Sequence, residues 1–429
     1  MTILFLGLST LIFLSCATAI ILNKRCGMAA LLFSIYHILF FLIPGIIHSH
    51  SNIFPFYGLS YSENIQLEGA LITFTFTIFV WIGYFLTPGK PQEIRHPPNI
   101  STLGSKGFLL AILILLTIQL FSISSIGINN FIVKRSDFDR DAFGSSFALR
   151  ELFLLLARSA SFACLALAIY FRKLIKITIA RYLILLSSTT TFLIINYPLA
   201  LPRFVIFSYL LFFICIYLPA TKKLKCIVFL GAMGGVTTIF PFISHITRGE
   251  GIFKFDLIKY YGNSGDFDGF QSLLNVVMYV KHAGFSWGHQ ISGAIFSLVP
   301  RSIWSSKPLP TGAIAADHVG YDYVNISSPI VAELFMDFGY FGAVIFAMVT
   351  GYFVRTIDNT ISGHNRPPTF INLFISATFI SYLVIVMRGP LIGAVNHFYI
   401  EAIIISAAIF IITSKLSLSG SFKIIRVVR

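Results

Sequence analysis

Residues 2–48 read TILFLGLSTLIFLSCATAIILNKRCGMAALLFSIYHILFFLIPGIIH, and this stretch decides the class of fold. Two apolar runs, 2–22 and 28–48, flank the basic pair Lys24 and Arg25. Each run has about the 20 residues that a helix needs to cross the hydrocarbon core of a membrane. No positive segment precedes the first run, so we interpret it as a spanning helix that enters from outside, rather than as a signal peptide.

The rest of the chain has the same character. Hydrophobic residues make up 56% of it and charged residues only 11%, whereas a soluble domain carries about 25% charged residues. Comparable runs occupy 2–22, 28–48, 66–87, 108–127, 149–171, 182–199, 204–220, 227–245, 329–354, 370–388 and 397–413. We therefore predict an all-α, polytopic membrane helical bundle of about eleven transmembrane helices, forming a single transmembrane domain over 1–429.

The basic residues predict an orientation. One alternate set of connections holds eighteen Lys and Arg residues, and the short connections of the other set hold five. Because Lys and Arg concentrate in cytoplasmic loops, we expect the N-terminus to be periplasmic and the C-terminus cytoplasmic. These loops also account for the net charge of +14, so we expect membrane lipids, and no nucleic acid, as partners.

The connection over 246–328 is far longer than an ordinary link between helices, and such segments are usually functional or disordered. It is rich in aromatic residues, and its apolar stretch Ile291 to Val299 is too short to span a membrane. We expect a large, folded periplasmic loop with a re-entrant or interfacial piece.

Several spans carry charged residues towards their predicted outer ends, where burial in hydrocarbon costs energy and marks candidates for function. They are Arg150 and Arg158, Glu333 and Asp337, and His397 and Glu401. The inner halves of these helices are expected to carry almost no charge. A transporter would place polar groups at the midplane, so the one-sided pattern favours an enzyme at the outer leaflet.

Two acidic clusters could in principle bind Mg²⁺ or Ca²⁺. Asp137, Asp139 and Asp141 alternate in one loop, and Asp266 and Asp268 form a D-x-D motif in the long connection. Lys134, Arg135 and Arg140 neutralise the first cluster, which favours a solvated, salt-bridged loop. No CxxC pair suggests a thiolate metal site.

Short motifs around the long connection resemble those of one family. They are Pro300-Arg301-Ser302-Ile303-Trp304-Ser305-Ser306-Lys307-Pro308 with Gly312-Ala313, then Asn325-Ile326-Ser327-Ser328-Pro329, Ala332-Glu333-Leu334 and Phe338-Gly339-Tyr340-Phe341-Gly342. Leu201-Pro202-Arg203 and Met387-Arg388-Gly389-Pro390 stand at the ends of other spans. This series resembles the Wzy-type O-antigen polymerases, which polymerise oligosaccharide repeat units. The resemblance covers roughly 195–400, but 128–148 is short where many members have a second large outward loop.

The resemblance implies a glycosyltransferase at the periplasmic face of the bacterial inner membrane. It would transfer a growing glycan from undecaprenyl diphosphate to a second lipid-linked repeat unit, with a chain-length regulator as a partner. Arginine suits diphosphate binding because its planar fork pairs with phosphate oxygens. The residues expected to bind diphosphate are Arg203, Arg301, Arg388, Arg158 and Arg248. Glu333 is the first candidate for the general base, before His318 and Asp317. No metal or cofactor is required, since arginines can stabilise the leaving group.

Two alternatives stay open. An O-antigen ligase would use the same donor with a lipid A-core acceptor, and His289 and His318 are compatible with that reaction. A polysaccharide flippase or transporter would instead need charged groups through the full depth of a central cavity.

Overall fold

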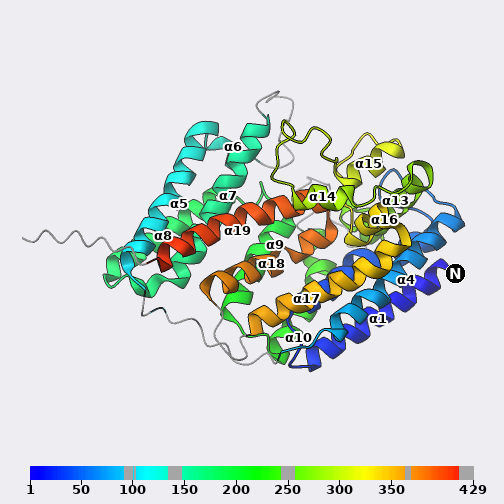
Figure 1. The fold of residues 1–429 in the computed structure, drawn as a ribbon, viewed down its shortest axis with the longest axis horizontal. Helices are drawn as coiled ribbons and strands as arrows, with labels where there is room; N and C mark the ends of the chain where they lie inside the picture. The colour runs from blue at the N-terminus through cyan, green and yellow to red at the C-terminus, as the bar shows by residue number, and fades with distance from the viewer. Residues whose placement is uncertain (91–99, 101–102, 134–146, 243–256, 363–368, 415–429) are drawn as a thin grey trace, which may run out of the picture. The chain divides into compact units, whose positions relative to one another are not determined.

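The computed structural model describes residues 1–90, 100, 103–133, 147–242, 257–362 and 369–414 (Figure 1). Within these ranges every regular element is a helix, and ten helices are long and apolar enough to cross a membrane. An eleventh, α9 (Arg203–Tyr217), is apolar but shorter. The prediction of an all-α, polytopic helical bundle is confirmed, and the chain is a multi-pass membrane protein.

The apolar runs of the sequence become helices with nearly the predicted bounds. They are α1 (Thr2–Leu22), α2 (Met28–Tyr36) continuing into α3 (Ile43–Ser51), α4 (Glu63–Leu86), α5 (Ser105–Ile126), α7 (Phe147–Tyr170), α8 (Thr178–Ile195), α9, α10 (Lys222–Gly234), α16 (Ile330–Phe341) continuing into α17 (Ala347–Ser362), α18 (Phe370–Arg388) and α19 (Leu391–Thr413). Large apolar side chains such as Leu11, Leu113 and Leu186 are exposed on them. Exposed apolar surface of this kind is suited to contact with lipid.

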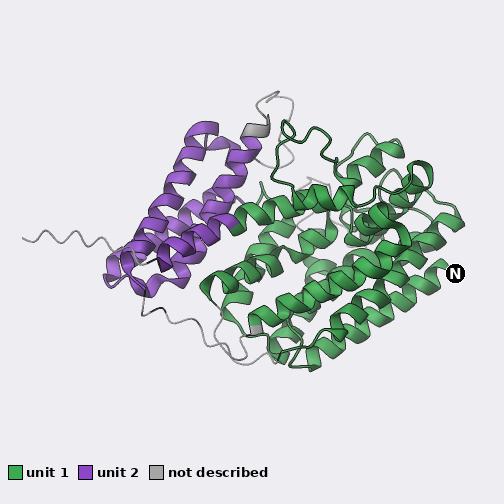
Figure 2. Ribbon diagram, viewed as in Figure 1, with its two compact units in different colours: residues 1–98, 133–139, 198–402 green, residues 99–132, 140–197, 403–429 purple. Residues whose placement is uncertain are grey.

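The chain divides into two compact units (Figure 2), and the single transmembrane domain over 1–429 stays a prediction. The first comprises 1–98, 133–139 and 198–402, and the second 99–132, 140–197 and 403–429. In the second unit α5, α7 and α8 pack together around a small apolar core made by Phe131, Leu154, Ala157 and Ile195.

The long connection is folded over its described part, 257–328. It contains α12 (Leu257–Asn263), η7 (Gly265–Phe267), α13 (Gly269–Ala283), α14 (His289–Ile295) and α15 (Thr311–His318). Helix α13 is deeply buried although it carries polar residues, because Gln271 and Asn275 both donate hydrogen bonds to the Tyr321 hydroxyl (2.9 and 3.2 Å). The apolar stretch from Ile291 begins within α14, and its interfacial placement stays a prediction.

The predicted cytoplasmic ends of the first unit carry more buried charge than the sequence suggested, so the expectation of almost uncharged inner halves is wrong. Helix α17 continues past the predicted end at 354, which places Arg355 and Asp358 on a buried helical face. Asp358 accepts hydrogen bonds from the N–H groups of Gly27 and Ala29 at the start of α2 (3.1 and 2.9 Å).

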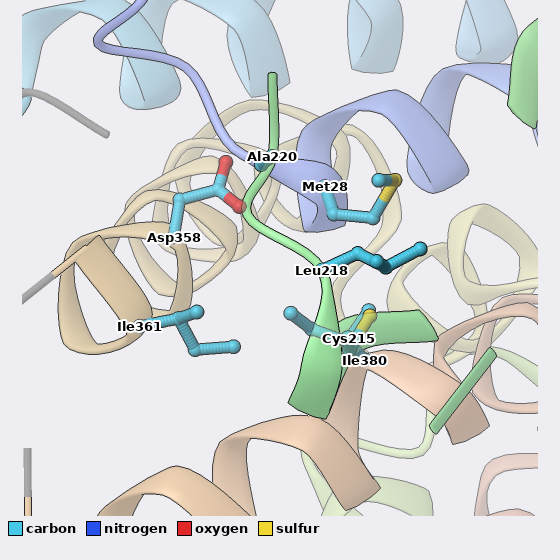
Figure 3. Close-up of a pocket in the computed structure, with 7 residues that line it drawn as sticks. All are labelled: Met28, Cys215, Leu218, Ala220, Asp358, Ile361 and Ile380. Atoms are coloured by element: carbon cyan, nitrogen blue, oxygen red, sulfur yellow. The ribbon is translucent and has the colours of Figure 1, made fainter. Parts of the chain in front are cut away.

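The other charges in this region also serve helix ends. Arg355 donates to the carbonyl of Arg25 (2.8 Å), and the Lys225 ammonium donates to the carbonyls of Ile20, Asn23 and Cys26. Groups at helix ends lack partners within their own helix, and these side chains supply them. Asp358 also lines a cavity of about 10 Å³ whose other lining residues are uncharged (Figure 3). Asp358, Arg355 and Lys225 therefore hold helices together. The cavity beside Asp358 has space for about one water molecule at most.

Candidate functional site

Arg203 is the first residue of α9 and projects towards η7. Its Nη2 atom lies 2.5 Å from Asp266 Oδ2, its Nη1 donates to the Phe240 carbonyl (3.0 Å), and its guanidinium lies over the Phe240 ring. Only 14% of the Arg203 side chain and 11% of the Asp266 side chain are exposed. A partly desolvated ion pair therefore joins α9 to the long connection.

Arg388 ends α18 and approaches the same turn from another helix. Its Nη2 atom donates to the Gly265 carbonyl (3.2 Å) and lies 3.6 Å from Asp268 Oδ1. The guanidinium lies over the ring of Phe204, the residue that follows Arg203. Arginine stacks on aromatic faces and stays charged when desolvated. The two predicted arginines are thus brought to one three-residue turn.

We call Arg203, Asp266, Asp268 and Arg388 the arginine–aspartate cluster. Asp268 is its most buried member, with a side chain that is 1% exposed. Burial raises the pKa of the Asp268 carboxyl, and this effect is opposed by Arg388 and by the Ser327 N–H, which donates to Oδ2 (2.9 Å). Two cations and two carboxylates balance in charge, so the cluster is an electrically compensated site.

Glu333 lies in α16, beside the residues that follow Arg388. Its carboxylate accepts hydrogen bonds from the Thr311 hydroxyl (2.5 Å) and from the Leu391 N–H (3.0 Å). It therefore ties the start of α15 and the start of α19 to α16. Asp337, one turn later, accepts from the Gln290 and Ile291 N–H groups at the start of α14 (3.0 and 2.8 Å). Glu333 and Asp337 thus hold the starts of α15, α19 and α14 against α16.

The alternative base candidates lie elsewhere on α15. Thr311, which contacts Glu333, begins this helix, whereas Asp317 and His318 end it, about 10 Å farther by helical rise. Both are exposed, and the His318 ring stacks with that of His282 (centroids 5.2 Å apart). They are not brought to Glu333.

Of the remaining predicted arginines, only Arg301 lies among the described residues of the first unit, and it contacts its own loop. Arg301 is exposed and donates to the Lys307 and Pro308 carbonyls of its own loop (2.5 and 2.9 Å). Arg158 is half-buried on α7 and belongs to the second unit. Arg248 and the cluster Asp137, Asp139 and Asp141 lie outside the described residues.

Sequence reasoning missed the ionic partners of the arginines. The sequence predicts Asp266 and Asp268 only as candidate metal ligands, and no local pattern points to the aromatic surfaces of Phe204 and Phe240. The D-x-D spacing was a usable signal for Asp266 and Asp268, because two carboxylates that alternate next to a helix start can face two cations. Among the described residues no group of three or more His, Cys, Asp or Glu side chains is placed to hold a metal ion.

Comparisons of the chain with protein-family models, with curated proteins and with solved structures find no match. The class that fold and site define is a multi-pass, all-α membrane protein with paired arginines and aspartates where two spans meet a long folded connection.

Proposed function

We propose that this protein is an O-antigen polymerase, which joins undecaprenyl-diphosphate-linked oligosaccharide repeat units at the periplasmic face of the bacterial inner membrane. The observation that supports it best is the meeting of Arg203 and Arg388 at η7. Two guanidinium groups from separate helices, at the ends of spans, suit a diphosphate carried at the membrane surface.

The proposed reaction is a glycosyl transfer. A sugar hydroxyl of the acceptor attacks the anomeric carbon of the donor glycan, the bond from that carbon to the diphosphate oxygen breaks, and the lipid diphosphate leaves with the bonding electrons. Arg203 and Arg388 stabilise the negative charge that develops on the leaving group. The hydroxyl proton passes to a general base.

Glu333 remains our candidate for that base. It is buried and lies beside Leu391, three residues after Arg388. Its hydrogen bonds from Thr311 and Leu391 also give it a positioning role. Asp317 and His318 have less support, because they are about 10 Å from Thr311 along α15.

The distribution of polar groups supports an enzyme over a flippase. Asp358, Arg355 and Lys225 are buried at the opposite ends of the first unit, but each is bonded to helix ends. They therefore serve packing and do not supply a polar path for a glycan. The basic connections at those ends support a cytoplasmic C-terminus and a periplasmic N-terminus.

Arg203→Ala and Arg388→Ala test the proposal in the producing bacterium. We expect each to abolish long-chain glycan on lipopolysaccharide and to leave single-repeat product, because removing one donor to a developing anion costs about 10²–10³ in rate. Electrophoresis of lipopolysaccharide checks this, with immunoblotting for protein level. Arg172→Ala is a matched control, because Arg172 is a surface residue of the second unit.

Persistence of normal chain lengths in well-expressed Arg203 and Arg388 variants would contradict the proposal. Bare core with accumulated lipid-linked polymer would instead indicate an O-antigen ligase. Accumulation of the lipid-linked repeat unit in the cytoplasmic leaflet would indicate a flippase.

A further inference from the structure

The arginine–aspartate cluster contains polar atoms whose bonding capacity is not used. Arg388 Nε is buried and has no acceptor among the residues that the structure describes, and Asp268 Oδ1 is likewise buried without a donor. Arg388 Nη2 and Asp268 Oδ1 are 3.6 Å apart, which is an ion pair beyond hydrogen-bonding distance. The guanidinium of Arg388 therefore keeps donor capacity for another anion.

We propose that Asp266 and Asp268 form ion pairs with the two arginines between reaction cycles and that the substrate diphosphate displaces them. This inference rests on the proposed function, because it assigns how that same site is regulated. It makes the two carboxylates competitors of the ligand and gives the site a preference for diphosphates over singly charged phosphate groups.

The local structure lets both carboxylates be displaced without losing all their partners. Asp266 Oδ2 also accepts from the Ser264 hydroxyl (3.1 Å), and Asp268 Oδ2 accepts from the Ser327 N–H (2.9 Å). A carboxylate that keeps a donor after losing its cation avoids part of the cost of a buried, unpaired charge. An exchange of anions at the arginines is therefore feasible within this fold.

The same pairing explains why a diphosphate is needed. The ester phosphate of a phospholipid carries a single negative charge, which can replace one of the two carboxylates. A diphosphate monoester carries more charge on two adjacent phosphorus centres and can pair with both arginines at once. Charge compensation by Asp266 and Asp268 thus disfavours the abundant phospholipid headgroups around the site.

Binding to the purified full-length protein in detergent tests the inference. The ligands are inorganic diphosphate, farnesyl diphosphate and a short-chain phosphatidylglycerol, whose phosphodiester carries one negative charge, each measured by calorimetry with EDTA and separately with Mg²⁺. We expect Asp266→Asn to bind both diphosphates on the order of tenfold more tightly than the unaltered protein, which equals about 1.4 kcal/mol. The variant should also gain measurable affinity for the phosphodiester.

Controls separate this effect from folding and from other ion pairs. Glu68→Gln removes the ion pair with Lys281 elsewhere in the first unit and should leave diphosphate binding unchanged. Arg388→Gln should weaken it. Thermal unfolding verifies that each variant is folded, and Asp268→Asn provides a second test of the same competition if Asp266→Asn is unstable.

The ligands also distinguish a lipid from a free source of diphosphate. Tighter binding of farnesyl than inorganic diphosphate supports a lipid-linked ligand, and equal binding supports recognition of the diphosphate alone; competition by Asp266 holds in both cases. Weaker binding by Asp266→Asn in EDTA would overturn the inference, because the ion pairs would then preorganise the arginines. If Asp266→Asn binds diphosphate more weakly only when Mg²⁺ is present, the inference is overturned in favour of a site for a metal–diphosphate complex.

Failure of the inference can be told from failure of the proposed function. If the unaltered protein binds diphosphate through Arg388 and Asp266→Asn changes nothing, only the internal competition is refuted. If neither protein binds any diphosphate, both are refuted.

Discussion

At the residue scale, the position of Arg388 depends on the glycine that follows it. Gly389 ends α18 with a φ of +64°, and a Cβ atom there would lie 1.9 Å from the Ser328 carbonyl oxygen. This close approach allows the Ser328 N–H to donate to the Arg388 carbonyl (3.0 Å). The backbone at Arg388 and Gly389 is thereby fixed against the end of the long connection.

Gly389→Ala should therefore displace Arg388. Only glycine adopts this backbone conformation without strain, and the strain in another residue costs about 1–3 kcal/mol. The contact of the added Cβ with Ser328 increases that cost. We expect a lower unfolding temperature and loss of long-chain glycan, measured in detergent and by lipopolysaccharide electrophoresis. Gly393→Ala, a few residues later on α19 with open space around its Cα, should have neither effect. Equal behaviour of the two variants would contradict this account.

The sequence predicts Arg203 and Arg388 as site residues from motifs at the ends of two apolar runs, but it does not predict their partners. The D-x-D motif marks Asp266 and Asp268 as acidic candidates, but no local pattern pairs either one with an arginine more than 60 positions away. Arg301, which was expected to bind diphosphate, is a different case, because its partners are local. Its donors are used by carbonyls six and seven residues later, a loop geometry that composition does not encode.

At the element scale, helix ends are where this protein uses its buried charge. Asp358 of α17 accepts from the N–H groups that begin α2, and Lys225 of α10 donates to the carbonyls that end α1. Negative charge near a helix N-terminus and positive charge near a C-terminus are both stabilising. These contacts join four helices at the predicted cytoplasmic ends of the first unit (Figure 1).

Asp358→Ala should be strongly destabilising without acting on ligand binding. It would leave the Gly27 and Ala29 N–H groups and the Tyr84 hydroxyl without their acceptor. We expect a loss on the order of 3–5 kcal/mol, the usual effect of removing one partner from a buried charged network. Thermal unfolding in detergent measures it, and Thr360→Ala on the exposed face of α17 is the control. An unchanged unfolding temperature for Asp358→Ala would show that water replaces the carboxylate.

The helices that cross the membrane were predictable because a helix in the hydrocarbon core must consist of a run of about 20 apolar residues. Helix α13 was not predictable in this way. Its Gln271 and Asn275 make the segment too polar for a span, and their partners Tyr61 and Tyr321 come from separate connections. The end of α17 was missed because Arg355 and Asp358 look like loop residues until their partners are known.

At the scale of the whole molecule, the first unit carries polar groups at both ends of its helices but uses them differently. At one end Arg355, Asp358 and Lys225 are bonded to backbone groups. At the other, Arg203 and Arg388 face the carboxylates of Asp266 and Asp268, which we propose a ligand replaces. Under the proposed function, the end that carries Arg203 and Arg388 is the reactive side of the molecule.

The reactive side must face the periplasm if the proposed function holds, and site-directed labelling decides this. Ile303 is 78% exposed in the long connection, and Lys24 is exposed between α1 and α2. A membrane-impermeant maleimide should label Ile303→Cys in cells whose outer membrane alone is permeabilised. It should label Lys24→Cys only after the inner membrane is opened. The five native cysteines are buried or half-buried, so the unaltered chain sets a low background. The reverse pattern would place Arg203 and Arg388 on the cytosolic side and would exclude polymerisation at the outer leaflet.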